Sequence, residues 1–186
     1  MFARLISLIG AVLMTLLLFY ATLPNLFSDR GSENGPLNQR HAPPFDADQE
    51  WFWINSEPLR WRDLHGKVVM LVVFNYDCAN CIRSLPWLRS LQRSYGERGF
   101  EIIGIHTPEF RYEHDLANVQ QATVDLGVTW PVALDNDWTT WRTYNNRYWP
   151  AMYLIDKAGN IRHLKIGEGQ YERTEQIIQA LLAEPG

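Results

Sequence analysis

The strongest feature of the hydrophobic pattern is segment 68–74, which is apolar throughout, rich in valine and followed by Asn75. A run without polar interruption predicts a strand buried on both faces of a sheet. A second run at 100–105, dense in isoleucine, predicts another buried strand. Between them, apolar residues recur at helical spacing over 78–95, so we expect a helix that ends near Gly96.

The rest of the chain continues to alternate helices and strands. Its pattern predicts a helix over 113–126, a strand over 132–134 and a helix over 137–144 that Asn136 or Asp137 caps. The remaining expected elements are a two-stranded hairpin and an amphipathic helix, at 151–155, 161–166 and 174–182. This order predicts an α/β fold whose mixed sheet is parallel at first, antiparallel at the end and flanked by helices.

Two aromatic segments, 51–54 and 59–61, precede the first buried strand and are separated by a polar turn. They predict short strands or an N-terminal hairpin. Their tryptophans could form a surface for a partner protein, but aromatic residues in strands more often pack at a sheet edge. We therefore expect a packing role.

The N-terminal region contains a long apolar stretch without a charge, from Leu5 to Leu23. A transmembrane helix needs about 20 such residues. Arg4 precedes the stretch, and this position of the positive charge predicts that the chain after it lies outside the cytoplasm. A cleaved signal peptide is the alternative, but residues 20–24 offer no small-x-small cleavage site, which favours an uncleaved anchor.

Composition divides the chain into three parts. Residues 1–27 form the anchor or signal peptide, and residues 28–44, rich in Gly, Pro, Asn, Ser and charged residues, predict a flexible tether. Residues 45–186 are numerous enough to bury a core. The net charge of −4 comes without a basic patch, so nothing indicates nucleic-acid binding.

The only two cysteines of the chain stand directly after the first buried strand, in the sequence Cys78-Ala79-Asn80-Cys81. A helix that begins at Cys78 stabilises a thiolate there, because its free N–H groups and partial positive charge favour the anion. Cys81, one turn later, can then resolve a mixed disulfide. An inert cysteine pair and half of a zinc site are the alternatives, but zinc needs four ligands and no second pair occurs. The pattern favours redox chemistry, without a metal or a cofactor.

The chain resembles the thioredoxin fold in several separate motifs. These are a strand that leads into Cys-x-x-Cys at a helix start, Pro86 five residues past the second cysteine, and Pro150 directly before the terminal hairpin. More narrowly, it resembles membrane-tethered TlpA/ResA-like thiol–disulfide oxidoreductases, which carry an inserted strand and helix. The stretches that look closest to the C-terminal redox domain of DipZ-type proteins are 66–69, 103–109, 131–136 and 146–150.

This resemblance implies the roles of individual residues. Cys78 is then the exposed nucleophile, Cys81 the buried resolving thiol, and Pro150 a cis-proline beside them. A cis bond would leave the backbone of Trp149 open to an extended substrate peptide, with Asp77 at the same edge. The expected partners are thiols and disulfides of exported proteins, including apocytochromes, and a membrane protein that donates or accepts electrons.

Three residues depart from the family pattern. Val72 replaces the buried acid of thioredoxin, Ser84 replaces the glutamate of ResA-like proteins, and Asp77 replaces an aromatic residue. The proton acceptor for the resolving thiol must then lie elsewhere. His106 and Glu109 follow the neighbouring strand at the same sheet edge, so we expect one of them to move the proton.

Two other functions share these residue types. A peroxiredoxin-type peroxidase has the same fold, but it requires a threonine where this chain has Asn75. A copper-binding or delivery protein could use the cysteine pair with a histidine, although related copper proteins use a longer cysteine spacing. The direction of electron flow stays open: Asp77 opposes a thiolate at Cys78 and favours a reducing couple, whereas the helix start acts in the opposite sense.

Overall fold

The computed structural model describes residues 40–44 and 52–185. In these residues, seven strands form one sheet in the order β1-β7-β6-β3-β4-β5-β2. The bounds of the strands are β1 Arg40–His41, β2 Trp53–Ile54, β3 Val68–Phe74, β4 Phe100–His106, β5 Val132–Leu134, β6 Ala151–Ile155 and β7 Asn160–Ile166.

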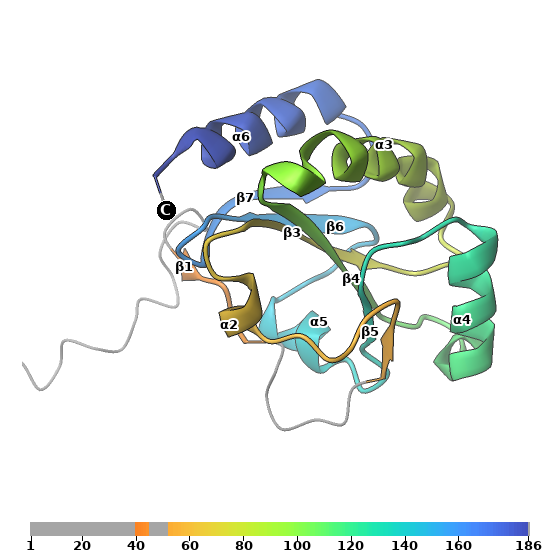
Figure 1. The fold of residues 1–186 in the computed structure, drawn as a ribbon. Helices are drawn as coiled ribbons and strands as arrows, with labels where there is room; N and C mark the ends of the chain where they lie inside the picture. The colour runs from red at the N-terminus through yellow and green to blue at the C-terminus, as the bar shows by residue number, and fades with distance from the viewer. Residues whose placement is uncertain (1–39, 45–51, 186) are drawn as a thin grey trace, which may run out of the picture. The chain divides into compact units, whose positions relative to one another are not determined.

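Helices cover both faces of this sheet. In Figure 1, α3 and α6 lie on one face, and α2 and α5 lie on the other. The bounds of the α-helices are α2 Trp61–Leu64, α3 Ala79–Tyr95, α4 Leu116–Asp125, α5 Thr139–Thr143 and α6 Tyr171–Ala183, and those of the 3₁₀ helices are η2 Gly96–Arg98 and η3 Arg111–His114.

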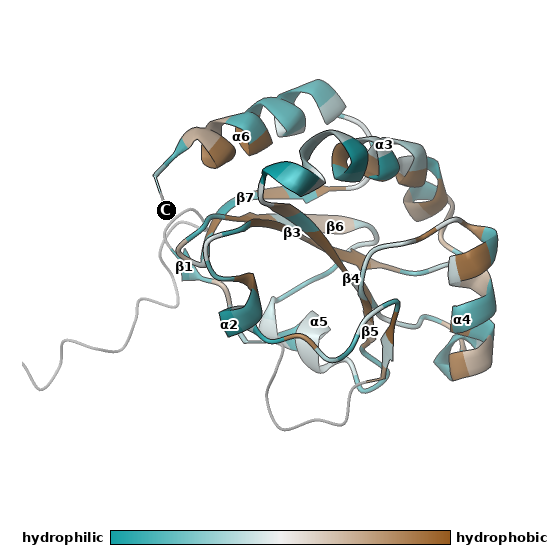
Figure 2. Ribbon diagram, in the orientation of Figure 1, coloured by the Kyte–Doolittle hydropathy of each residue, from teal (hydrophilic) through white to brown (hydrophobic). Residues whose placement is uncertain are grey.

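Strand β3 is the centre of the sheet. It runs parallel to β4 and antiparallel to β6, and all of its residues are buried. Because alternate side chains of a strand point to opposite faces, Val72 packs with α3 and α6, whereas Leu71 and Val73 pack with the layer of α2 and α5. This double burial explains the continuous apolar run. Figure 2 shows hydrophobic β3 and β4 between the helical layers.

The mixed sheet that the sequence predicted is confirmed. Strands β3, β4 and β5 are parallel, and β6 and β7 form the antiparallel hairpin. Helix α4, strand β5 and helix α5 lie between β4 and the terminal hairpin and correspond to the expected insertion. The long helix α3 follows β3 directly, as the pattern of apolar residues indicated.

The predicted N-terminal hairpin is wrong. Strand β2 pairs antiparallel with β5, and Trp61–Leu64 is a helix instead of a strand. Asn55 turns the chain with φ 65°, and its side-chain amide donates hydrogen bonds to the carbonyls of Val128 and Trp130. The edge of β5 supplies the backbone partners that a hairpin would have supplied, so β2 pairs with a segment distant in sequence.

Two predicted boundaries also change. Arg40–His41 pairs with β7 and Ala42 is buried, so the fold begins before residue 45, inside the predicted tether. The helix expected over 113–126 is divided into η3 and α4. Asp115 separates them, because its side chain accepts hydrogen bonds from the backbone N–H groups of Ala117 and Asn118 and so caps α4.

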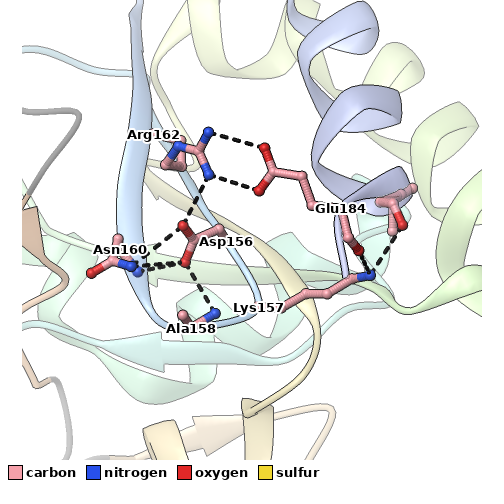
Figure 3. A network of polar contacts seen from close by, with 7 residues as sticks. Asp156, Lys157, Ala158, Asn160, Arg162 and Glu184 are labelled. Carbon is pink, nitrogen blue, oxygen red and sulfur yellow. Dashed lines mark hydrogen bonds and ion pairs between the residues drawn. The ribbon is translucent and has the colours of Figure 1, made fainter. Parts of the chain in front are cut away.

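The β6–β7 turn is tied to the end of α6 by the polar network of Figure 3. Arg162 donates to Asp156 and makes two hydrogen bonds to the carboxylate of Glu184. Lys157 donates to the main-chain carbonyls of Leu182 and Glu184. These bonds fix the C-terminal helix against the sheet.

The membrane anchor expected over residues 5–23 lies outside the described residues. Within residues 40–44 and 52–185, no helix has both the length and the apolar character that crossing a membrane requires.

Candidate active site

The two cysteines lie where β3 gives way to α3. Cys78 occupies the N-cap position of α3, and its carbonyl accepts the first helical hydrogen bond, from Ile82 N at 3.0 Å. Its own N–H donates to the carbonyl of Asn75 at 3.3 Å. The side chain is half-buried, beside the unpaired N–H groups of the first helical turn. This position favours a negative charge on the sulfur.

Cys81 lies one turn further along α3 and is only 3% exposed. Burial raises the pKa of its thiol, and its hydrogen bond with Cys78 raises it further, whereas a backbone hydrogen bond with Asn75 opposes the change. Cys81 is thus shielded from an incoming protein. A half-exposed and a buried thiol one turn apart suit attack by the first and resolution by the second.

The loop before β6 completes the surroundings of Cys78. The Trp149–Pro150 peptide bond is cis, which confirms the prediction, and Cys78 Sγ contacts the carbonyl oxygen of Trp149 at 3.8 Å. Ala151 pairs with Val73 near the end of β3, and this register brings the two loops together.

Trp149 packs against two tryptophans of the α5 region. Its ring centroid lies 4.3 Å from that of Trp141 and 5.7 Å from that of Trp138. The position of α5 is fixed by Asp135, whose carboxylate accepts hydrogen bonds from the N–H groups of Thr140 and Trp141. A chain of contacts therefore leads from Asp135 to the carbonyl beside Cys78.

Sequence reasoning placed the cap of α5 at Asn136 or Asp137, and Asp137 does accept the backbone N–H of Thr139. The same reasoning missed the buried Asp135. The hydroxyl of Thr107, at the end of β4, donates a third hydrogen bond to this carboxylate. Burial raises the pKa of Asp135, and the three hydrogen bonds act in the opposite direction. An acid directly after a predicted strand is the signal that could have identified it.

Asp77 lies on the exposed side of the site. Its carboxylate accepts a 2.6 Å hydrogen bond from the hydroxyl of Tyr112, which raises the pKa of Tyr112 to about 12. Tyr112 in turn stacks on Phe110, and both rings are about half exposed, at 49% and 50%. The bond joins the turn before Cys78 to the η3 region.

The two predicted proton acceptors, His106 and Glu109, lie in opposite surroundings, one buried and one exposed. His106 is fully buried, its ring is stacked on Tyr76 at 5.3 Å, and burial lowers its pKa to about 4. Such a group is a weak base at neutral pH. The side chain of Glu109 is exposed. Within the part of the chain that the structure describes, neither residue forms a hydrogen bond or ion pair with Cys78 or Cys81, and the role of Glu109 stays a prediction.

A small, mostly apolar cavity lies beside Cys81, and Val72 and Ser84 belong to its lining. These are two of the three positions at which the sequence departs from the pattern of the family that it resembles. The Ser84 hydroxyl donates to the Asn80 carbonyl at 2.9 Å. The lining residues are Val72, Phe74, Cys81, Ser84, Leu85, Leu88, Trp130, Pro150 and Met152. In the described part of the protein this cavity contains no ionisable group besides the thiol.

Another acid that sequence reasoning missed is Glu113, which is fully buried near the start of the Cys78 loop and hydrogen-bonded to the side chain of Asn75. The described residues contain no cluster of three or more His, Cys, Asp or Glu side chains able to hold a metal ion.

The fold and the site together define a thioredoxin-like thiol–disulfide oxidoreductase. The chain belongs to the AhpC/TSA family, whose profile matches residues 39–164. It is 43% identical over 139 residues to the protein DipZ of Mycobacterium tuberculosis, an alignment that covers 72% of this chain and 20% of DipZ. The chain thus corresponds to about a fifth of that longer relative.

Two further relatives match most of their own length. The thiol–disulfide oxidoreductase ResA of Bacillus thuringiensis is 30% identical over 128 residues, which cover 69% of this chain and 71% of ResA. The crystal structure of a thiol–disulfide isomerase from Corynebacterium glutamicum has a TM-score of 0.69 and 28% identity, and the match covers 77% of this chain and 98% of that one. These similarities confirm the resemblance to the DipZ and ResA proteins.

Proposed function

We propose that the protein is a membrane-tethered oxidoreductase that exchanges disulfides with exported proteins, with Cys78 as the nucleophile and Cys81 as the resolving thiol. The observation that carries this proposal is the contrast between the two sulfurs. Cys78 is accessible at the start of α3, whereas Cys81 is buried one turn behind it. Only Cys78 can meet a disulfide of a folded or extended partner.

In the reductive direction the exchange has two steps. The thiolate of Cys78 attacks one sulfur of the substrate disulfide, forms a mixed disulfide and releases the other sulfur as a thiolate that takes up a proton. Cys81 then loses its proton and attacks Cys78, which closes the Cys78–Cys81 disulfide and releases the second substrate thiol. The protein gives up two electrons, and oxidation of a substrate is the same sequence in reverse.

The substrate segment is proposed to lie in extended form beside Trp149. The main chain of Trp149 runs next to Cys78, and strand-like hydrogen bonding at this position brings a substrate sulfur to the nucleophile. Exposed apolar side chains occur in the adjoining segments, at Ile82 and Tyr148, and Asp77 lies at the same edge. Such a surface suits unfolded or flexible protein segments.

The proposed location rests on the uncharged stretch over residues 5–23 and the preceding Arg4. This arrangement orients the catalytic domain away from the cytoplasm. Substrates are then exported proteins with cysteine pairs, such as apocytochromes, and a membrane protein exchanges electrons with the Cys78–Cys81 couple.

The activity is tested with the full chain in detergent. We expect it to reduce insulin disulfides with dithiothreitol as the electron source, and we expect Cys78→Ser to abolish the reaction. Undiminished exchange in Cys78→Ser contradicts the proposal. Rapid peroxide turnover would instead favour a peroxidase, and tight stoichiometric Cu(I) binding without exchange would favour a copper protein.

The location is tested by labelling Cys78 in the Cys81→Ser variant. A membrane-impermeant maleimide is applied to spheroplasts that express the full chain, and a permeant maleimide serves as the control. Labelling of intact spheroplasts by both reagents supports an exported domain. Labelling by the impermeant reagent only after lysis contradicts it.

A further inference from the structure

Glu113 is a carboxylate inside the protein whose hydrogen bonds all converge on one oxygen. Oε2 accepts from the N–H groups of Glu109 at 2.6 Å and Phe110 at 2.7 Å, and from the side-chain amide of Asn75 at 2.7 Å. Oε1 is buried without a hydrogen-bond partner in the described residues. Burying a carboxylate without hydrogen bonds costs folding free energy. The three donors to Oε2 are therefore held firmly in position.

Asn75 passes this constraint to the cysteine loop. It is 1% exposed, and its side-chain oxygen accepts a hydrogen bond from the N–H of Asp77 at 2.7 Å. Its main-chain carbonyl accepts the N–H of Cys78 at 3.3 Å. Asn75 therefore donates a hydrogen bond from its side-chain NH₂ group to Glu113. Its side-chain and main-chain oxygens accept hydrogen bonds from Asp77 and Cys78.

The acceptor oxygen Oε2 of Glu113 determines which way the Asn75 amide is turned, because it already accepts two backbone N–H groups and has no proton to donate there. If the amide were reversed, its oxygen would face the carboxylate oxygen at hydrogen-bond distance and its NH₂ group would face the N–H of Asp77. Both contacts would be repulsive. Glu113 thus selects the orientation in which Asn75 closes the turn that leads to Cys78.

We propose that Glu113, acting through Asn75, is a positioning residue that holds the loop carrying the Cys78 sulfur for disulfide exchange. The inference rests on Cys78 being the attacking cysteine of the proposed function. A purely architectural role is the alternative, because the bonds to Glu109 and Phe110 also close the start of η3. Those two bonds do not involve Asn75, and this difference allows the roles to be separated.

The test compares Asn75→Ala, Glu113→Ala, Glu113→Gln and the double variant Asn75→Ala/Glu113→Ala in the full chain. Glu172→Ala is the matched control, because Glu172 is exposed on α6 and its side chain makes no hydrogen bond or ion pair among the described residues. Each variant is measured for its Tm, its kcat/KM in insulin reduction and the redox potential of the Cys78–Cys81 couple.

We expect Asn75→Ala to lower kcat/KM by about tenfold and to shift the redox potential, because a charge-assisted hydrogen bond of the loop is lost. Glu113→Gln retains an oxygen that can accept the same three bonds and should stay within about threefold of the wild type. The double variant should be no slower than Glu113→Ala, since both changes break one connection.

Unchanged kcat/KM in Asn75→Ala overturns the proposal, and so do losses that multiply in the double variant. A loss in Glu113→Gln as large as that in Asn75→Ala also contradicts a role through hydrogen bonds. If Glu113→Ala does not fold, Asn75→Ala and Glu113→Gln decide the question. Failure of the proposed function itself is recognised separately, by exchange activity that persists in Cys78→Ser.

Discussion

The sulfur of Cys78 lies 3.8 Å from the main-chain carbonyl oxygen of Trp149, a residue 71 positions later in the chain. The pairing of β3 with β6 creates this contact, because Val73 and Ala151 are register partners at the edge where the cysteine loop begins and the loop of Trp149 ends. The sulfur that we propose as the nucleophile therefore lies beside the main chain that we propose as the substrate-binding segment.

The difference in exposure between the cysteines predicts which variant accumulates a mixed disulfide. In Cys81→Ser, Cys78 still attacks a substrate, but the buried partner that would release it is gone. We expect a stable mixed disulfide with an unfolded substrate that still contains its own disulfide, seen by non-reducing electrophoresis and mass spectrometry. Cys78→Ser should give none. Equal trapping by both variants would contradict the assigned roles.

The contact between Trp141 and Trp149 predicts that removing the Trp141 ring weakens the reaction with protein substrates more than the reaction with small disulfides. Removing one ring of an aromatic pair costs about 0.5–1.5 kcal/mol beyond its buried area. We expect Trp141→Ala to raise KM for insulin several-fold and to change exchange with a small disulfide much less. Phe52→Ala is the control, because Phe52 is 58% exposed and lies beside β2. Equal losses with both substrates would argue against a docking role.

The burial of His106 predicts an acid-dependent loss of stability. Its pKa falls to about 4 in the folded state from an ordinary value of 6.5. Between these values the unfolded chain binds more protons, so the free energy of unfolding rises with pH by about 3 kcal/mol across this window and falls as the solution is acidified.

His106→Phe should remove this contribution, because phenylalanine fits between the rings of Phe74 and Tyr76 and does not titrate. The measurement is urea unfolding between pH 4 and pH 7, the pH range that spans the two pKa values of His106. The exposed His65→Gln should keep the pH dependence of the wild type. An unchanged pH slope in His106→Phe would show that His106 is not the cause.

The hydrogen bonds that Asp135 accepts from α5 predict a large loss of stability from a single substitution. Asp135→Ala leaves the buried N–H group of Thr140 and the half-buried N–H group of Trp141 without acceptors, and the buried one alone costs about 1–3 kcal/mol. Urea unfolding should show this loss. Asp137→Ala, at the exposed position that the sequence favoured as the cap, should cost clearly less. The opposite order would refute the assignment.

Local patterns determined much of this protein. The apolar runs identified β3 and β4, because strands buried on both faces carry hydrophobic residues at every position. Helical periodicity placed α3 directly after Cys78. The same periodicity indicated that Cys78 and Cys81 lie close together, since residues one helical turn apart share a face of the helix. Pro150 was found through the family resemblance, and its cis bond confirms that inference.

Only the tertiary structure decided which distant segments meet. It paired β2 with β5, buried His106 beneath Tyr76, and brought Glu113 to Asn75. None of these relationships leaves a periodic signal, because each joins residues far apart in the chain. A carboxylate is polar wherever it occurs in a sequence, and only the packing around it determines whether it meets water or a backbone N–H. The reactive pair is thus defined locally, and its surroundings are defined by the fold.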